Sequence, residues 1–383
     1  MTQHSEDILT RSVTNIIPSR TLLEAKLKEK KLRVYMGIDP TATRIHIGHA
    51  VLLRKLQAFV ELGHTVTFLI GDFTALVGDT SDKDTERPLL TYDEIKENFK
   101  TYKAQAEKIL DFSKVTVVHN STWLKDLTFE DVVKLCQNFS VGDFTSRTLI
   151  KTRLESGKHV GLHETLYPVM QGYDSWHLDT DIQLGGADQT FNMQAGRTLQ
   201  KIKRNKESFV LVTGYLEGTD GRKMSKSWGN AIWLTDSPQE MFGKIMSLKD
   251  SLLESYLTNG TSLTQSEIDE IMNISKKEPM NAKIKLALQI VKELHSQDDA
   301  LRAHEHFQKT FQDKTPEYKT QVVLKDTLME IVSDQVGSNS EAKRLITSGS
   351  VKINEQECRD PKTTLKGSEK IKIGKKIFIT VIK

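Results

Sequence analysis

The 383-residue sequence contains few cysteines and no long apolar run. Its two cysteines, Cys136 and Cys358, cannot build a disulfide framework and suit a reducing compartment. No apolar stretch approaches the roughly 20 residues that a membrane-spanning helix needs. The first residues include Glu6 and Asp7 and lack the apolar segment of a secretory signal. These absences predict a cytoplasmic protein that does not enter a membrane.

The composition indicates a globular protein with an unusual tail. Hydrophobic residues make up 37% and charged residues 27% of the chain, and its length predicts two or three domains. Residues 343–383 hold 11 lysines and arginines against 4 acidic residues, whereas the whole chain has a formal net charge of only +3. A basic tail on an acidic body points to nucleic acid or an anionic surface as the partner of the tail.

A buried strand followed by a helix is predicted near the N-terminus. Residues 32–38 form a short apolar run, and Pro40 stops it because proline cannot continue a ladder. Residues 48–59 are good helix formers with apolar positions at helical spacing. His46 and His49 therefore lie in the first turn of a helix that follows a strand.

That position favours a nucleotide. Backbone N–H groups without partners and the helix dipole attract anions, so a phosphate is the natural ligand. The imidazoles of His46 and His49 project to one side, and Gly48 lets a nucleotide approach the backbone closely. A two-histidine metal site and a pair of surface histidines are the alternatives. No Cys or Asp lies nearby at zinc-ligand spacing, so we predict no metal ligands.

A second motif lies far downstream in a polar, glycine-flanked loop. It consists of Lys223, Met224, Ser225, Lys226 and Ser227. Alone, such a run more often means a solvated charged loop. Together with the histidine motif, it is the combination found in class I aminoacyl-tRNA synthetases, and the chain resembles that family.

The remaining pattern predicts an α/β fold, namely a doubly wound Rossmann-like catalytic domain. Its predicted strands are residues 32–38, 66–70, 115–118, 181–184 and 209–212. Residues 120–180 are predicted to be a helical insertion between the two halves of this sheet. Within it Tyr167, Gln171 and Asp174 share one helix face, which is either a polar solvent face or part of a site.

At the level of individual residues, the chain resembles the tyrosyl-tRNA synthetases of bacteria and organelles nearly from end to end. The matching stretches include Tyr35, Asp79, the 167–174 helix, residues 185–189 and residues 241–247. The resemblance implies that Tyr35 and Asp174 contact a substrate phenol, and that Asp79, Tyr167 and Gln171 hold its ammonium group. A carboxylate and a phenol placed this way would be left unpaired by phenylalanine. The sequence departs at Met36, where relatives often have a small or polar residue.

The resemblance also implies how ATP is bound. Thr41, His46 and the loop lysines would contact the phosphates, His49 and Asp188 the adenosine, and Gln189 both ATP and the reacting carboxylate of tyrosine. The predicted catalytic residues are Thr41, His46, His49, Lys223 and Lys226. The predicted ATP-binding set adds Asp39, Gly48, Gly186, Asp188, Gln189, Met224, Ser225 and Ser227.

The implied reaction joins L-tyrosine to ATP as tyrosyl-adenylate, with Mg²⁺ on the polyphosphate, and then transfers tyrosine to tRNA(Tyr). We expect a catalytic domain at 1–235, a helical anticodon-arm domain at 236–315 and a small α+β, S4-like RNA-binding domain at 320–383. The predicted RNA-binding residues are Lys343, Arg344, Lys352, Lys375 and Lys376. A homodimer formed through the helical insertion is a further expectation from the resemblance.

Three other interpretations stay open. A tryptophanyl enzyme shares the nucleotide motifs, but the Tyr35 and Asp174 pair and the S4-like module argue against it. Another nucleotidyltransferase with the same histidine motif, acting on a small acceptor, would not need a basic tail. A catalytically silent RNA-binding relative would not need intact histidines and loop lysines.

Overall fold

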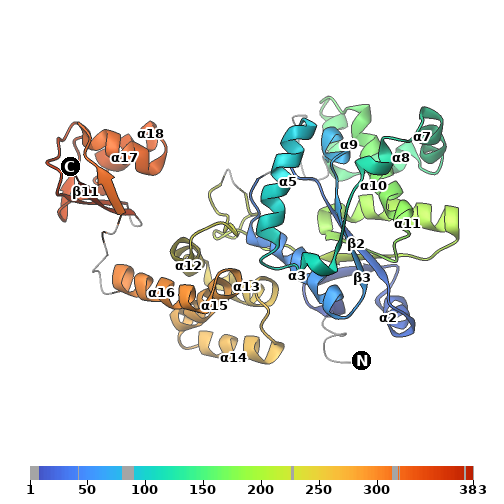
Figure 1. Cartoon of the computed structure of the whole chain (residues 1–383), viewed down its shortest axis with the longest axis horizontal. Helices are drawn as coiled ribbons and strands as arrows, with labels where there is room; N and C mark the ends of the chain where they lie inside the picture. Colours follow the sequence, from blue (N-terminus) through green and yellow to red (C-terminus); the bar gives the residue numbers. More distant parts are fainter. Residues whose placement is uncertain are drawn as a thin grey trace. The chain divides into compact units, whose positions relative to one another are not determined.

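A computed structural model describes residues 8–41, 43–79, 90–225, 228–312, 318, 320–374 and 377–382 (Figure 1). The chain forms two compact units, Met1–Ala300 and Leu301–Lys383. The predicted boundary between the catalytic and helical domains, near residue 235, falls inside the first unit and stays a prediction. Among the described residues, no helix combines the length and apolar character that crossing a bilayer requires.

A six-stranded sheet forms the centre of the first unit, in the order β1-β6-β5-β2-β3-β4. Its strands are β1 (Val13–Ile17), β2 (Arg33–Ile38), β3 (Thr65–Ile70), β4 (Thr116–His119), β5 (Ile182–Gly186) and β6 (Phe209–Thr213). The five predicted strands are all present and pair in parallel. The edge strand β1 was not predicted, and it pairs antiparallel with β6.

The strand order contains one change of direction. From β2 the chain moves outward to β3 and β4, and from β5 it moves outward the other way to β6. The connecting helices are α3 (Ile47–Glu61), α5 (Tyr92–Ala106) and α11 (Thr190–Arg204). Because such crossovers are right-handed, α3 and α5 cover one face and α11 covers the other (Figure 1). A crevice therefore opens where β2 meets β5, beyond the carboxyl ends of both strands.

The segment between β4 and β5 is helical, as predicted. It contains α6 (Ser121–Leu124), α7 (Phe129–Cys136), α8 (Val141–Thr145), α9 (Thr148–Glu155) and α10 (Leu162–His177). A buried, bidentate ion pair between Arg153 and Glu164 links α9 to the start of α10, with N···O distances of 2.6 and 2.9 Å. Helix α10 then packs along α11, and Gly172 permits this approach, because a Cβ there would lie 3.1 Å from the backbone of Ala195.

The short helix α4 (Thr74–Val77) follows β3 and lies beside α10. Residues 214–300 complete the first unit with a loop and a bundle of helices. The bundle comprises α12 (Pro238–Met246), α13 (Leu253–Gly260), α14 (Gln265–Ser275) and α15 (Pro279–Leu294), and α16 (Gln297–Phe307) begins in this unit and crosses its boundary at Ala300. Pro279 is the first residue of α15. Proline fits this position because the first helical N–H has no intrahelical partner.

The second unit contains a separate small sheet in the order β7-β11-β10-β8-β9. Its elements are β7 (Thr320–Val323), α17 (Leu328–Val336), α18 (Asn339–Thr347), β8 (Val351–Ile353), β9 (Gln356–Cys358), β10 (Lys370–Ile373) and β11 (Ile377–Ile382). Strand β7, which the sequence did not predict, pairs in parallel with β11. The side chain of Thr327 caps the start of α17. Buried residues of both helices and the sheet, including Ile331, Ile346 and Ile379, form its core.

Candidate active site

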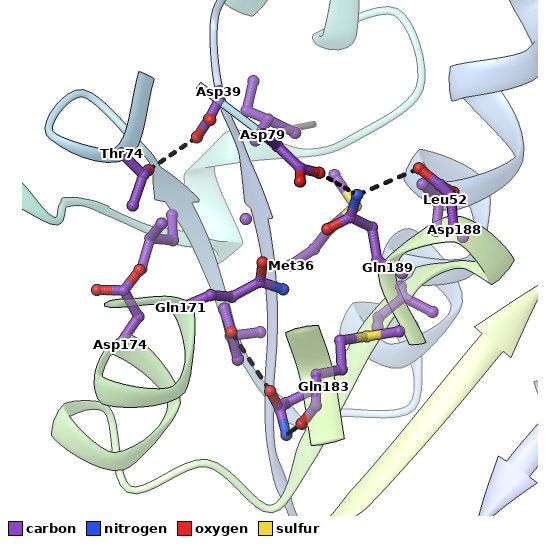
Figure 2. Close-up of a pocket in the computed structure, with 18 of the residues that line it drawn as sticks. Met36, Asp39, Leu52, Thr74, Asp79, Gln171, Asp174, Gln183, Asp188 and Gln189 are labelled. Atoms are coloured by element: carbon purple, nitrogen blue, oxygen red, sulfur yellow. Dashed lines mark hydrogen bonds between the residues drawn. The ribbon is translucent and has the colours of Figure 1, made fainter. Parts of the chain in front are cut away.

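A cavity of about 270 Å³ lies at the crevice between β2 and β5 (Figure 2). Its walls contain most of the residues predicted for tyrosine and several predicted for ATP. They are Tyr35, Asp39, Thr41, His49, Asp79, Tyr167, Gln171, Asp174, Gly186, Asp188 and Gln189. Met36 also lines the cavity. The chain thus brings together residues from both halves of the sheet and from α10.

A buried carboxylate and a buried phenol close the inner end of this cavity. Asp174 is 2% exposed and Tyr35 is 4% exposed. The two oxygens of Asp174 accept hydrogen bonds from Trp123 Nε1 at 2.7 Å and from Asn120 Nδ2 at 3.1 Å. Tyr35 donates a long hydrogen bond of 3.5 Å to Gln183 Oε1. This end therefore offers an acceptor and a hydroxyl to a polar group on an otherwise apolar ligand.

The Asp174 carboxyl has an unusual affinity for protons. Burial raises its pKa to about 8, against the two donor hydrogen bonds from Asn120 and Trp123, which favour the ionised form. A ligand hydroxyl that donates to Asp174 would add a third hydrogen bond and lower this pKa. The site is therefore suited to a ligand that completes the coordination of this carboxylate.

The middle of the cavity is negative. Asp79 is 7% exposed and accepts a hydrogen bond of 2.7 Å from Gln189 Nε2. Tyr167 donates to Asp39 Oδ2 at 2.9 Å. Figure 2 shows the Gln171 side chain extending into the cavity from the side of Asp174 toward Gln189. The pKa of the Tyr167 phenol is raised, first by burial and then by the carboxylates of residues 39, 79 and 174. The carboxylates of Asp39 and Asp79 beside this phenol make the region suitable for a cationic group such as an ammonium.

The two signature histidines lie at the start of α3, as predicted, with their ring centroids 3.8 Å apart and stacked. Burial, then His49 and Lys223, lowers the pKa of His46 to about 2, so its ring is neutral at pH 7. Burial of its ring among protein atoms lowers the pKa of His49 as well, although the residue as a whole is exposed. Gly48 leaves room for this arrangement, since a Cβ there would lie 2.9 Å from His46 Nδ1.

The lysine loop reaches the same place. Ile47 N donates to Ile232 O and Leu234 N donates to Ile45 O, both at 2.9 Å, so the segment after the loop pairs with the His46 turn. Lys223 lies close enough to His46 to lower its pKa, after the larger effects of burial and His49. Lys223 is exposed and Met224 is buried. Lys226 and Ser227 lie outside the described residues.

Several residues of the site were missed. Gln183 is a polar residue in an apolar strand, which is a signal that could have revealed it. Asn120 and Trp123 carry no such signal, because their partner Asp174 is distant in sequence. Asn230 also organises the lysine loop: its Oδ1 accepts from Ser225 N at 2.8 Å and its Nδ2 donates to Lys223 O at 3.1 Å.

The doubly wound sheet, the histidine turn and the lysine loop define the catalytic core of a class I aminoacyl-tRNA synthetase. The model of the family described as tRNA synthetases class I (W and Y) matches residues 27–312. The chain belongs to this family, as the two signature motifs predicted.

Curated relatives that match the chain nearly from end to end are tyrosine–tRNA ligases. The tyrosine–tRNA ligase of Carboxydothermus hydrogenoformans is 43% identical over 98% of this chain and 97% of its own length. That of Thermotoga maritima is 39% identical over 98% and 96%. Among solved structures, a C-terminally truncated mitochondrial tyrosyl-tRNA synthetase of Aspergillus nidulans superposes with a TM-score of 0.68 at 25% identity, covering 80% of this chain and 93% of that chain.

The burial of Asp174 has a consequence for stability. Its pKa is about 8 in the folded protein and about 3.9 in an unfolded chain. Between these values the folded state keeps a proton that the unfolded state releases, so stability falls as the pH rises. We expect the free energy of unfolding of the wild type to fall relative to Asp174→Asn by at most about 1.4 kcal/mol per pH unit. Urea unfolding at pH 5 and pH 8 measures this difference, and an equal gap between the two proteins at both pH values would contradict it.

Proposed function

We propose that this enzyme is a tyrosine–tRNA ligase that acts in translation in the cytoplasm. It activates L-tyrosine with ATP to tyrosyl-adenylate, releasing pyrophosphate, and then transfers the tyrosyl group to the 3′ end of tRNA(Tyr). The observation that carries the proposal is the pair of Tyr35 and Asp174, which are both buried and both line the cavity. A substrate phenol placed there donates to the carboxylate and bonds to the Tyr35 hydroxyl, while indole and phenyl side chains offer no hydroxyl.

The tyrosine then lies along the cavity in one orientation. Its ammonium group meets the negative region around Asp79, Tyr167 and Gln171. Its carboxylate points toward Gln189 and the nucleotide end. Holding both ends of the amino acid places the carboxylate for attack, which is the main advantage that such a site provides.

The chemistry needs no side-chain nucleophile. A carboxylate oxygen of tyrosine attacks the α-phosphorus of ATP, and the bond from that phosphorus to the bridging oxygen of pyrophosphate breaks. His46 and His49 supply neutral hydrogen-bond donors, while Thr41, Lys223 and Lys226 stabilise the charge that develops on the phosphates. The backbone at Gly48 and Gly186 and the side chains of Asp39 and Asp188 complete the nucleotide site. In the second step a ribose hydroxyl of the tRNA attacks the acyl carbon, and AMP leaves.

Mg²⁺ fits this site as a companion of ATP. In the described part of the chain, no three His, Cys, Asp or Glu side chains are grouped to hold a metal ion. The histidines at the phosphate end are uncharged at pH 7, so they leave much of the polyphosphate charge unbalanced. Phosphate oxygens and water would therefore hold Mg²⁺, and its charge would neutralise the polyphosphate.

Two macromolecular partners follow. The tRNA would contact the second unit, where Lys343, Arg344 and Lys352 belong to the basic tail; Arg344 is 66% exposed in its side chain and pairs with Glu341. Lys375 and Lys376 lie outside the described residues.

A second copy of the chain would cover the helical insertion. Five large apolar side chains there are exposed, namely Phe129, Val133, Val141, Leu154 and Leu162.

One assay tests the function directly. The wild-type protein is incubated with ATP, labelled pyrophosphate and each of the amino acids tyrosine, tryptophan and phenylalanine, with and without tRNA. We expect exchange of pyrophosphate into ATP with tyrosine alone, without a need for tRNA. Exchange with tryptophan would favour the tryptophanyl alternative, and no exchange with any amino acid would favour a silent relative.

Removing the Tyr35 hydroxyl should weaken the choice of tyrosine over phenylalanine. Tyr35→Phe deletes one neutral hydrogen bond to the substrate, which is worth about 0.5–1.5 kcal/mol, or roughly 2- to 13-fold in the ratio of the two kcat/KM values. Pyrophosphate exchange with both amino acids measures this ratio. Tyr256→Phe is the control, because that buried phenol donates to Glu217 O outside the cavity. The proposed role is wrong if both variants change the ratio equally.

The tail should serve the tRNA and not the amino acid. Deleting residues 320–383 removes the basic module and leaves the first unit intact. We expect tyrosine-dependent pyrophosphate exchange to persist, while charging of tRNA falls and loses its steep salt dependence, because phosphate contacts are lost. Unchanged charging by the truncated protein would refute this role.

A further inference from the structure

One carboxylate outside the cavity is as deeply buried as those within it. Asp236 lies in the loop between the lysine motif and α12 and is 4% exposed. Its neighbour in space is Lys244. This lysine belongs to residues 241–247, one of the stretches in which the chain resembles tyrosyl-tRNA synthetases. The cavity contains neither residue. Any effect of Asp236 and Lys244 on the site must therefore pass through other residues.

The Asp236 carboxylate joins three segments of the chain. Its Oδ2 accepts from Lys244 Nζ at 2.6 Å and from Trp233 N at 2.8 Å. Its Oδ1 accepts from Arg44 Nη2 at 3.2 Å. Two cationic partners and a backbone donor satisfy the buried charge, and removing one of them leaves it poorly paired. The carboxylate thus fixes the approach to the histidine turn, the segment after the lysine loop, and α12 to one another.

These contacts continue to His46. The Arg44 guanidinium lies over the Trp233 ring, 4.6 Å from its centroid, and the same ring lies 5.8 Å from the ring of His46. The backbone bonds of residues 45 and 47 to residues 234 and 232 lie on either side of His46. A displacement of Asp236 would therefore be transmitted to His46 through both side-chain and backbone contacts.

The other side of Asp236 faces the helical bundle. Lys244 comes from α12, which packs against α15. His295, the C-cap residue of α15, lies close to Asp236. Asp236 therefore links α12 and α15 to the segments that carry the two signature motifs.

We propose that Asp236 is a positioning residue for amino-acid activation: paired with Lys244 and Arg44, it holds the His46 turn against the lysine loop in the arrangement that receives ATP. The inference rests on the proposed function. It assigns Asp236 no contact with either substrate, since its effect passes through Trp233 and the backbone. Tyrosine binds at the far end of the cavity and does not depend on this arrangement.

Two variants weaken the cluster from opposite sides without removing the buried carboxylate. Lys244→Met removes the cation of α12, and Arg44→Gln removes the contacts of a side chain that is 44% exposed, so little of the fold depends on it. Lys244→Arg restores the charge. Lys283→Met is the matched control, because Lys283 is a half-buried lysine of the same bundle that pairs with Asp250 at 2.6 Å, outside the cluster.

The test measures kcat and KM for ATP in tyrosine-dependent pyrophosphate exchange, and Kd for tyrosine by equilibrium dialysis. We expect kcat/KM for ATP to fall about 10- to 100-fold in Lys244→Met and Arg44→Gln, the scale of a small misplacement of reacting groups. The Kd for tyrosine should change by less than about twofold, as for independent sites. Lys244→Arg should recover most of the activity, and Lys283→Met should match the wild type.

Other outcomes are decisive as well. Equal losses for ATP and tyrosine, or the same loss in Lys283→Met, would show a merely structural role and overturn the inference. Unchanged ATP kinetics in both cluster variants would do the same. A wild-type protein that shows no exchange would instead refute the proposed function, which is a separate result.

Discussion

The reversal of direction between β2 and β5 is the constraint on which the site depends. Right-handed crossovers send α3 and α5 to one face of the sheet and α11 to the other, so a crevice opens at the carboxyl ends of the two central strands. Tyr35 and Gln183 come from these two strands and are paired across them. The insertion then supplies α10, whose close packing on α11 brings Asp174 to the same place.

Electrostatics divides the cavity into two ends. At the inner end, the carboxyl group of Asp174 is buried at the cost of its hydration. Hydrogen bonds donated by Trp123 and Asn120 compensate for part of this cost. At the outer end, burial keeps the His46 ring neutral, so it serves as a hydrogen-bond donor and adds no charge. A zwitterionic amino acid fits such a gradient, because its ammonium group meets negative charge and its carboxylate faces the nucleotide.

The two signature motifs are joined by backbone pairing and not by side chains alone. The segment 232–234 bonds to the residues on either side of His46, and Asn230 shapes the loop before it. Both arrangements use backbone groups, which any sequence offers. The specific side chains of Arg44, Asp236 and Lys244 determine which backbone arrangement is stable.

Much of this organisation could be predicted from the sequence. Apolar runs determined the five parallel strands, helix-forming residues with apolar positions at helical spacing determined α3, and the spacing of Tyr167, Gln171 and Asp174 determined that they share a face. These features are local, because periodicity involves residues a few positions apart. The edge strands β1 and β7 were missed because their short runs become strands only when β6 and β11 pair with them.

Only the tertiary structure decided how the chosen residues are buried and paired. Asp174 has an elevated pKa because distant segments exclude water from it, and its partners Asn120 and Trp123 come from another helix and strand end. Asp236 looks like an ordinary loop aspartate in the sequence, yet three segments converge on it. Desolvation and long-range pairing depend on contacts between residues far apart in the chain, and no local pattern encodes them.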